Sequence, residues 1–563
     1  MHRILRYGLC LQLLLLPGWK ATDLNGQLQH PGRPLVDRSL LKAAEVFYVL
    51  PPVDPLEIEA AMESPQGGNK SFRFALERPV TLNPESHGAW SIQGGWRIWS
   101  LHLVSPEARS LGLVLHPFRL EPGVRLFVYT PDMSEVKGAF TAGNNKPTGV
   151  LPVGHLSGEE LILELQVPAG HPDYGNLQVE LVSHAFLDPR SMIVPADCGP
   201  GEFGCSHPCE IDVNCAEGSE WQTEKRSVVR IFTTRQYCTG VLVNNTSYDG
   251  TPYILTAEHC INRKYYADRS VFQFSYESPE CFGGDGRLDL SISGCDSIAI
   301  GDSLDFSLVR LSVAPPDSFG VYFAGWDRSD FQTSGTAAIH HPWGDVKKIS
   351  FDREIPSIPN SQGDVPYTDL KDYHYFSYWW IRSWDIGTTE GGSSGSPLFN
   401  EGKQVIGVLS GGIARCGDSI GYDEENQRVI YNNAFNFDDY YTRMRYAWDF
   451  NGQDGPSLKP WLDPAGTGAI SLEGYEPVGV RPAELAVPPP HFLVFPNPVT
   501  DRIRLVPRHP LSGTFRFSLT GLSGKSRMSG EGSATGTELL IPPTLKPGIY
   551  ILRIESASHI EQH

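Results

Sequence analysis

The sequence predicts a mostly β protein built from several domains, and three observations lead to this fold class. Its 563 residues exceed the size at which a single hydrophobic core stops growing. It contains 57 glycines and 45 prolines, a content typical of turn-rich β structure. Apolar residues alternate over short runs between turn residues, whereas a helical repeat is weak throughout. We therefore expect many short strands and few helices.

The net charge of the chain indicates which kinds of molecule are not expected as its main partner. Hydrophobic residues make up 40% of the chain and charged residues 20%, as in a globular protein. Lys and Arg number 46 against 65 Asp and Glu, which gives a formal net charge of -19. Such an acidic chain is poorly suited to nucleic acid or to an anionic membrane surface. We expect no nucleic-acid partner.

Residues 1–21 have the features of a secretory signal peptide. Arg3 and Arg6 form a basic start, an apolar run with four consecutive leucines follows, and cleavage near Ala21 fits the pattern. The apolar run is too short to span a bilayer, and no later segment reaches the roughly 20 apolar residues that a membrane helix needs. We therefore expect an exported protein.

The ten cysteines agree with export. Cys10 lies in the signal peptide, eight others fall between Cys198 and Cys295, and Cys416 follows later. In an exported protein such a cluster predicts disulfides rather than a metal site. The stretch Cys205-Ser206-His207-Pro208-Cys209 has a metal-like pattern, but no second paired ligand cluster accompanies it. We expect neither a metal nor another cofactor.

The N-terminal region, residues 22–197, contains no cysteine and is predicted to form a β-sandwich. Its apolar runs are separated by Gly, Pro and an Asn-Asn pair. The expected strands are Trp96–Val104, Leu111–Leu115, Arg125–Tyr129 and Leu161–Val167.

Two further domains and a linker follow. The cysteine-bearing middle region covers residues 198–475, and a proline-rich linker covers residues 476–491. Residues 492–563 again have short β segments and predict a small C-terminal β-sandwich. The expected strands there are Arg502–Val506, Thr514–Leu519 and Gly548–Ile554.

Three short segments of the middle region carry side chains suited to acyl transfer. They are Leu255-Thr256-Ala257-Glu258-His259-Cys260, Leu304-Asp305-Phe306-Ser307-Leu308 and Gly391-Gly392-Ser393-Ser394-Gly395-Ser396-Pro397. This chemistry needs a hydroxyl nucleophile, an imidazole that takes its proton, and a carboxylate that orients the imidazole. We assign these roles to Ser394, His259 and Asp305. Because glycine lets successive amides converge, we expect the Gly392 and Ser394 amides to form an oxyanion hole.

Each segment alone also has a purely structural explanation. The serine segment could be a flexible loop, the histidine segment part of the core, and the aspartate segment the edge of a strand. Their order, with 46 residues from His259 to Asp305 and 89 from there to Ser394, suits one site assembled between two barrels. The three motifs resemble those of trypsin-like serine proteases. That resemblance implies a double β-barrel catalytic domain.

The middle region is similar to one branch of that family, the bacterial lysyl endopeptidases. The similar stretches are Cys209–Cys215, Leu242–Thr246, Gly325–Asp327, Ile339–Pro342, Gly387–Glu390 and Trp461–Pro464. In this context the His340-His341 pair is expected to be a structural strand end rather than a metal site. The resemblance implies three disulfides, namely Cys209–Cys416, Cys215–Cys281 and Cys238–Cys260. It leaves Cys198, Cys205 and Cys295, an odd number, so that one is free, removed, or paired only after processing.

A candidate specificity residue also comes from the resemblance. Lysyl endopeptidases hold the substrate lysine with an acid in an Asp-x-Tyr-Gly-Arg pattern, and Asp439-Tyr440-Tyr441-Thr442-Arg443 is similar. This points to Asp439 as the residue that binds the lysine side chain. The alternative is that Asp439 and its acidic neighbours are surface charges. Those neighbours are Asp438, Asp423, Glu424 and Glu425.

The chain departs from the family at two positions. Ser410 stands where a lysyl endopeptidase has a histidine. Ser393 replaces the aspartate that pairs with the new N-terminus in trypsin, so that activation switch is absent. We expect activation to proceed by removal of the N-terminal region, which resembles a propeptide and would act as an inhibitor. Arg190 is the only basic residue between Lys146 and Lys225, so cleavage at the domain junction would use Arg190 or another protease.

The C-terminal region resembles the sorting domains of Bacteroidetes type IX secretion. The similarity rests on Phe495–Asp501 and Leu545–Tyr550, although the usual basic end is missing. It implies the type IX machinery as a partner, export through the periplasm of a Gram-negative bacterium, and a secreted or surface location. The alternative is a small β-sandwich that binds carbohydrate or protein.

Together these features predict a monomeric secreted serine endopeptidase that cleaves proteins and peptides after basic residues, preferentially lysine. One rival hypothesis is a catalytically silent adhesion protein. Another is a trypsin-like protease of different specificity, for example for acidic residues, which an acid at Asp439 disfavours.

Overall fold

The computed structural model divides the chain into two compact units, Met1–Val478 and Gly479–His563. It describes residues 32–35, 47–62, 72–186, 204, 206–329, 333–359, 375–417, 419–423, 428–431, 438–449 and 456–477, and in the second unit residues 492–495, 502–507, 514–521, 526–533, 537–540, 550–555 and 560–562. The expected signal peptide, the Arg190 junction, Cys198 and Cys205 lie outside the described residues. Most of the expected linker does so as well.

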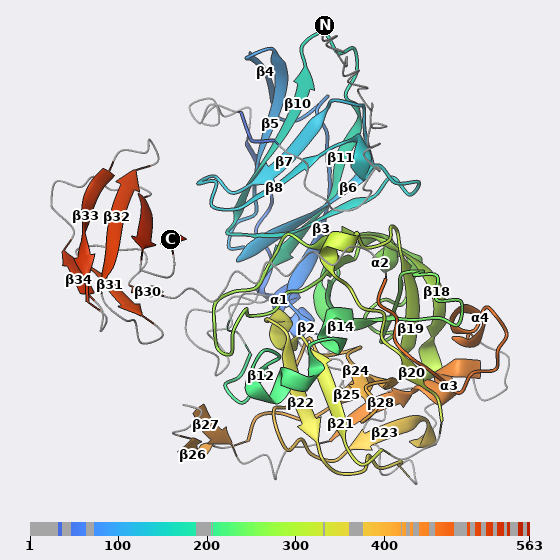
Figure 1. Ribbon diagram of the computed structural model, residues 1–563. Helices are drawn as coiled ribbons and strands as arrows, with labels where there is room; N and C mark the ends of the chain where they lie inside the picture. The colour runs from blue at the N-terminus through green and yellow to red at the C-terminus, as the bar shows by residue number, and fades with distance from the viewer. Residues whose placement is uncertain are drawn as a thin grey trace, which may run out of the picture. The chain divides into compact units, whose positions relative to one another are not determined.

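The N-terminal region is a β-sandwich (Figure 1). The larger sheet contains β1 (Phe47–Val49), β4 (Ala89–Gln93), β5 (Trp96–Val104), β7 (Arg125–Tyr129), β8 (Val136–Phe140) and β10 (Glu160–Pro168). The smaller sheet contains β3 (Ala75–Leu82), β6 (Ser110–Leu120), β9 (Leu151–Ser157) and β11 (Gly175–Ala185). One core cluster takes Leu101 and Leu163 from the larger sheet and Leu113 and Val179 from the smaller, so the sheets pack face to face. Helix α1 (Pro55–Met62) follows β1 and precedes the other strands of the sandwich.

The middle region contains two large, predominantly antiparallel sheets. The first contains β13 (Val228–Phe232), β14 (Gln236–Val243), β15 (Tyr253–Thr256), β16 (Val271–Gln273), β17 (Ser291–Ser293), β18 (Cys295–Gly301) and β19 (Phe306–Leu311), and β2 (Phe72–Arg73) of the N-terminal region pairs with β14. The second contains β12 (Ile211–Asp212), β20 (Trp326–Asp327), β21 (Thr336–His340), β22 (Lys348–Asp352), β23 (Tyr378–Ile381), β24 (Pro397–Phe399), β25 (Val405–Gly412), β28 (Asp439–Arg443) and β29 (Ser471–Leu472).

Each of these sheets has its own core, and a third cluster joins them. Ile231 and Ile254 belong to the core of the first sheet, and Leu398 and Leu409 to that of the second. Short connecting elements complete the region, namely α2 (Lys264–Arg269), α3 (Met444–Asp449), α4 (Lys459–Leu462) and the hairpin of β26 (Ser419–Asp423) and β27 (Arg428–Tyr431). The predicted fold class is confirmed: the chain is mostly β, with a two-barrel domain in its middle.

Disulfides link distant parts of the middle region. Within the described residues they join Cys209 to Cys416, Cys215 to Cys281, and Cys238 to Cys260. These are the pairs that the family resemblance implied. Of the cysteines that the structure describes, Cys295 is buried and unpaired with another sulfur.

The second unit contains two small sheets. One pairs β31 (Arg502–Pro507) with β30 (Phe492–Phe495) and β34 (Thr537–Leu540); the other pairs β32 (Phe515–Gly521) with β33 (Ser526–Gly532) and β35 (Tyr550–Glu555), and β36 (Ile560–Gln562) pairs with β35. Alternate residues of β32 are buried, among them Phe515 and Phe517. This alternation is the pattern of a sheet with one buried face.

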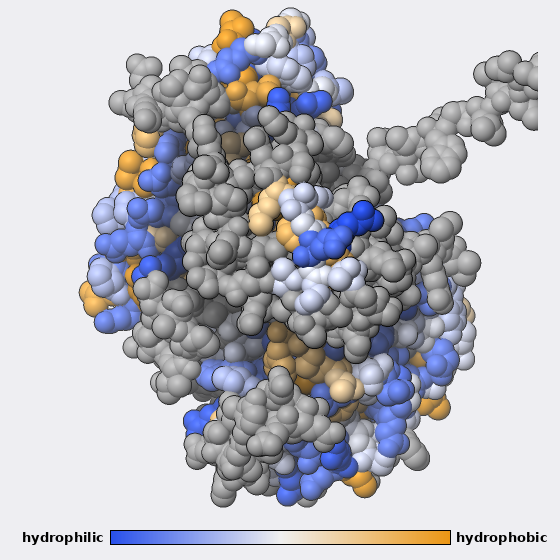
Figure 2. Space-filling model, turned by 60° about the vertical axis from the view of Figure 1, so that its left-hand side comes forward, coloured by the Kyte–Doolittle hydropathy of each residue, from blue (hydrophilic) through white to orange (hydrophobic). Residues whose placement is uncertain are grey.

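The described surface is mixed in polarity. Figure 2 shows hydrophilic side chains over most of the described part of one face, with hydrophobic ones in small groups. Strongly exposed apolar residues such as Leu56, Ile92 and Ile470 belong to separate segments of the chain. None of the helices that can be described is both long and apolar enough to cross a membrane.

Candidate active site

The serine segment forms a tight turn immediately before β24. Gly392 and Gly395 have positive φ values of 96° and 79°. A Cβ atom on Gly392 would lie 2.7 Å from the carbonyl oxygen of His341, and one on Gly395 would lie 2.5 Å from that of Thr239. Both positions therefore require glycine for conformational and steric reasons.

The structure brings His259 and Asp305 together because they follow and precede paired strands. His259 lies just after β15, Asp305 lies just before β19, and β15 pairs with β19. The side chain of His259 is largely buried, and that of Asp305 is 4% exposed. Asp305 has a φ of 53°, a left-handed conformation that aspartate tolerates better than most residues.

The three predicted catalytic residues form one hydrogen-bonded chain. His259 Nδ1 lies 3.0 and 2.9 Å from the two carboxylate oxygens of Asp305, and the His259 backbone N–H donates to Oδ1 at 3.1 Å. The Oγ of Ser394 lies 2.7 Å from His259 Nε2. A carboxylate at Nδ1 favours the tautomer with its proton there, which leaves the lone pair of Nε2 facing the Ser394 hydroxyl.

Charged neighbours determine the basicity of this imidazole. Burial lowers the pKa of His259, but the negative charge and hydrogen bond of Asp305, aided by Glu258, outweigh it and raise the pKa overall. Burial, together with the nearby charges of Asp305 and Asp302, raises the pKa of Glu258 to about 7. His259 is thus a stronger base than an isolated histidine.

Strand β14 fixes the carbonyl groups of the serine turn. The Thr239 N–H donates to the Ser394 carbonyl at 2.8 Å, and the Thr239 hydroxyl donates to the Gly392 carbonyl at 3.0 Å. Within the described residues, neither the Gly392 N–H nor the Ser394 N–H donates to a protein acceptor. These two amides are available to an oxygen atom bound beside Ser394.

Ser393, which replaces the aspartate of trypsin, is anchored by a buried histidine. His340 Nδ1 lies 2.8 Å from the Ser393 hydroxyl, and the Glu390 N–H donates to the same hydroxyl at 3.1 Å. The other ring nitrogen of His340 lies 3.1 Å from the Ser350 hydroxyl. His340 is the last residue of β21 and holds the serine turn against the second sheet.

A second support comes from the segment that precedes β12. Glu390 accepts a hydrogen bond from the His207 N–H at 3.0 Å, and its carboxylate contacts the His207 ring. The hydrogen bond to Glu390 raises the pKa of His207, although burial opposes the shift. The sequence singled out His207 only within a metal-like pattern, and Glu390 only within a family motif. No local signal connects two residues so far apart in the chain.

Asp439 is completely buried at the start of β28. Its Oδ2 accepts hydrogen bonds from Trp384 Nε1 at 2.7 Å and from the Thr389 hydroxyl at 2.6 Å. Across the sheet Asp439 pairs with Gly412, where a Cβ atom would lie 2.7 Å from the Asp439 Cα and would also collide with its carboxylate. Asp439 is therefore not a surface charge.

The neighbouring positions behave differently. Asp438 is partly exposed and accepts a hydrogen bond from the Tyr440 hydroxyl at 2.9 Å. Asp423 is in β26, whereas Glu424 and Glu425 lie outside the described residues. Ser410 is buried in β25, and its hydroxyl lies 2.8 Å from that of Thr442.

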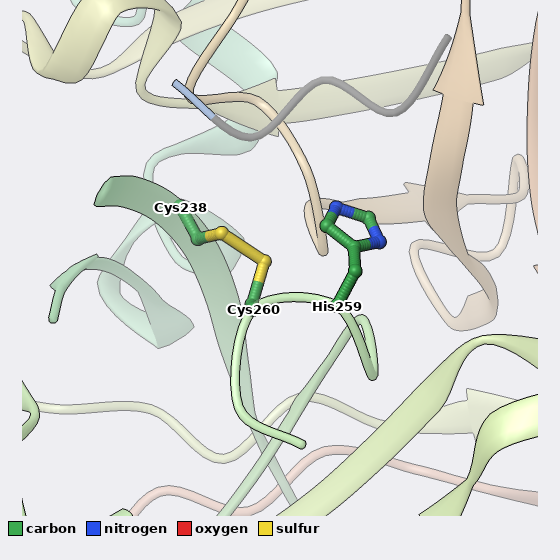
Figure 3. Close-up of side chains that lie close together, drawn as sticks. All are labelled: Cys238, His259 and Cys260. Carbon is green, nitrogen blue, oxygen red and sulfur yellow. A yellow bond between two sulfur atoms is a disulfide. The ribbon is translucent and has the colours of Figure 1, made fainter. Parts of the chain in front are cut away.

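One group of potential metal ligands lies beside the site. Among the described residues, Cys238, His259 and Cys260 have ligand atoms within 4.8 Å of one another (Figure 3). The two sulfurs are joined in a disulfide, so neither is a thiolate that binds metal. The His259 ring nitrogens face Asp305 and Ser394. The closeness of the group reflects a disulfide that fixes the histidine loop.

Comparison with known proteins gives a family match in the middle region. Residues 203–428 match the family model described as lysyl endopeptidase, C-terminal domain. A lysyl endopeptidase of Pseudomonas aeruginosa is 29% identical over 281 residues, which are 46% of this chain and 57% of that protein. The chain thus spans just over half the length of this curated relative.

Two solved peptidase structures are also similar to the chain, at low sequence identity and low TM-score. A Glu endopeptidase in complex with MPD is 12% identical, with a TM-score of 0.24, and the match covers 39% of this chain and 85% of that one. Kallikrein-related peptidase 10 is 16% identical, with a TM-score of 0.26, and the match covers 41% of this chain and 94% of that one.

Proposed function

We propose that this chain is a serine endopeptidase that cleaves proteins after basic residues, preferentially lysine. The observation that carries the proposal is the 2.7 Å contact between Ser394 Oγ and His259 Nε2, with Asp305 at the opposite ring nitrogen. A hydroxyl, an imidazole and a buried carboxylate in this order form the minimum set for nucleophilic acyl transfer. The family match of residues 203–428 supports the same reading.

The reaction follows from these contacts. The Ser394 oxygen attacks the carbonyl carbon of the substrate bond while its proton passes to His259 Nε2. The amides of Gly392 and Ser394 stabilise the negative oxygen of the tetrahedral intermediate. His259 then gives the proton to the departing amine, which leaves an acyl-enzyme on Ser394. A water molecule, deprotonated by His259, hydrolyses that ester and restores the hydroxyl.

Asp439 supplies the proposed preference for lysine. If this buried carboxylate binds the substrate side chain, a cationic side chain stabilises it and neutral or acidic side chains are disfavoured. Replacing it removes one partner of a buried ion pair in the bound complex, at a cost of about 3–5 kcal/mol, or roughly a hundredfold to a few thousandfold in rate.

The experiment compares Asp439→Ala with Asp438→Ala as its matched control. Both proteins, freed of the N-terminal region, are labelled with a fluorophosphonate and incubated with a denatured protein mixture whose cleavage sites are mapped. Asp439→Ala should lose cleavage after lysine and keep Ser394 labelling, whereas Asp438→Ala should keep both. Unchanged lysine preference in Asp439→Ala would refute the pocket. If the fluorophosphonate labels no serine in the parent protein, the hypothesis of a catalytically silent adhesion protein would be favoured.

We also propose that the protein is exported and matures by loss of its flanking regions. The disulfides support an oxidising compartment. Residues 1–21 would direct export, the N-terminal region would inhibit the enzyme, and the C-terminal unit would direct type IX secretion. Deletion of residues 492–563 should leave the protease in the periplasm. Normal release into the medium would exclude a sorting role for that unit.

A further inference from the structure

A short strand of the N-terminal region is bound to the edge of the catalytic domain. Strand β2 runs antiparallel to β14, with Phe72 opposite Tyr237 and Arg73 opposite Gln236 (Figure 1). Addition of a strand to a sheet edge is a general way in which proteins bind extended peptides. Strand β14 lies between β13 and β15 in its sheet, but β15 pairs only with Val241–Val243, and β2 pairs with the other end of β14, at Gln236 and Tyr237.

The same edge of β14 leads to the proposed nucleophile. Along a strand, alternate residues direct their N–H and C=O groups toward the same neighbour. Tyr237 lies opposite β2, and two residues on, the Thr239 N–H donates to the Ser394 carbonyl at 2.8 Å. Two residues further, Val241 pairs with Leu255 of β15. Along this side of β14, the backbone carbonyl of Ser394 therefore contacts Thr239, between Tyr237, which pairs with β2, and Val241, which pairs with β15.

The antiparallel direction of β2 determines how a chain runs past this edge. A peptide that continued the observed register beyond the position of Phe72 would face Cys238 with its next residue and Thr239 with the one after that. A strand rises about 3.3 Å per residue on both sides of such a pair. A peptide bound as β2 is bound would therefore bring the second residue before Phe72 to Ser394.

In this sequence the second residue before Phe72 is Lys70, which is followed by Ser71; both lie outside the described residues. Under the function proposed above, lysine is the side chain that the buried carboxylate of Asp439 selects. We propose that β2 binds the leaving-group side of the substrate groove, and that the enzyme hydrolyses the Lys70–Ser71 bond of its own chain.

The step is an ordinary hydrolysis and needs no further reactant than water. Ser394 forms an ester with the Lys70 carbonyl, and the nitrogen of Ser71 departs with the proton that His259 took from the hydroxyl. Water then releases Lys70 as a carboxylate and regenerates Ser394. The new amino terminus belongs to Ser71, directly before β2.

Cleavage of this bond does not by itself release the N-terminal region, because other contacts hold it. The Phe74 N–H donates to the Arg235 carbonyl at 3.0 Å, and the Phe74 ring stacks on Tyr237 at 4.3 Å. Arg269 forms an ion pair with Glu180 at 2.8 Å. The cut strand therefore remains on the leaving-group side and competes with protein substrates until the whole region is removed.

The test follows the N-terminus of the full chain during incubation at neutral pH, by N-terminal sequencing and intact mass. It uses the parent chain, Ser394→Ala, Lys70→Ala, and Lys42→Ala as the matched control. We expect a fragment that begins at Ser71 from the parent and Lys42→Ala chains. Ser394→Ala and Lys70→Ala should not produce it, and each should stay intact at that bond.

Fluorophosphonate labelling of Ser394 and cleavage of a denatured protein are measured in parallel on every chain. Chains that are active in both assays but never start at Ser71 would overturn the inference and leave the proposed function standing. Chains inactive in both assays, even after limited proteolysis removes the N-terminal region, would overturn the proposed function as well. A Ser71 terminus that also forms in Ser394→Ala would assign the cut to another protease and refute self-cleavage.

Discussion

Replacing Asp305 by asparagine tests the proposed catalytic chain most sharply. In the parent protein the carboxylate accepts from the His259 backbone N–H at 3.1 Å and lies 2.9 and 3.0 Å from Nδ1. An asparagine has one accepting oxygen and one donating NH2 group. If its oxygen keeps the backbone hydrogen bond, its NH2 group faces Nδ1. The ring then carries its proton on Nε2, where the lone pair that accepts the Ser394 proton should be.

The expected loss is large because the change leaves the residues in place but gives the wrong tautomer. In a Ser-His-Asp triad this substitution lowers kcat by about 10⁴, or about 5 kcal/mol of transition-state stabilisation. The pH profile should change as well. Asp305 raises the pKa of His259, whereas burial lowers it. Without the carboxylate the acid limb of kcat/KM should therefore move to lower pH.

The assay measures kcat and kcat/KM between pH 5 and 9 on a lysyl amide, with protein freed of the N-terminal region. Asp302→Asn is the matched control, because this substitution removes a nearby negative charge at a residue that does not hydrogen-bond to His259. The rate of this variant should stay within a few-fold of the parent rate. Circular dichroism checks that both variants are folded. A loss below tenfold in Asp305→Asn, or an acid limb that moves to higher pH, would refute the role given to Asp305.

Three further predictions concern charge and packing around the site. Glu258→Gln removes a charge that raises the pKa of His259, so the acid limb of kcat/KM should shift to lower pH; an unchanged profile would show that the charge is not felt. The pKa of His207 is raised by its carboxylate partner, so His207→Gln should lower the melting temperature most below about pH 6.5, and the difference should shrink as pH rises through the raised pKa. A difference that grew with pH would contradict that pairing. Gly412→Ala places a Cβ atom against Asp439, so KM for lysyl substrates should rise at least tenfold while labelling of the nucleophile persists; unaltered KM would show that the pocket adapts.

The parts of the proposed site that could be predicted from the sequence are those that lie in short local motifs. Glycines at 392 and 395 are needed where the turn has positive φ and close backbone neighbours, so the serine segment could be identified from residue types alone. His259 and Asp305 follow and precede strands that pair. The expected strands of the N-terminal sandwich, such as Trp96–Val104 and Arg125–Tyr129, likewise have clear apolar patterns and coincide with β5 and β7.

The features that could not be predicted from the sequence depend on contacts between segments that are far apart in the sequence. Glu390 and His207 are 183 residues apart, and neither has neighbours that would indicate the other. Strand β2 has two residues, too few to show any periodicity, and it pairs with an end of β14 that β15 does not cover. Such features arise from tertiary packing, which a local pattern does not encode.

The geometry of the site also distinguishes two ways in which the N-terminal region could keep the enzyme inactive. In trypsin-like activation a new N-terminus rebuilds the serine loop, but here Ser393 already contacts His340, and Glu390 already contacts His207. The Ser394 hydroxyl lies at hydrogen-bonding distance from His259 in the chain that still carries the N-terminal region. Since the proposed catalytic groups already lie within hydrogen-bonding distance, we expect that a distorted site is not what would prevent catalysis. Inhibition would act by occupation of the groove, and removal of the region would expose the site rather than build it.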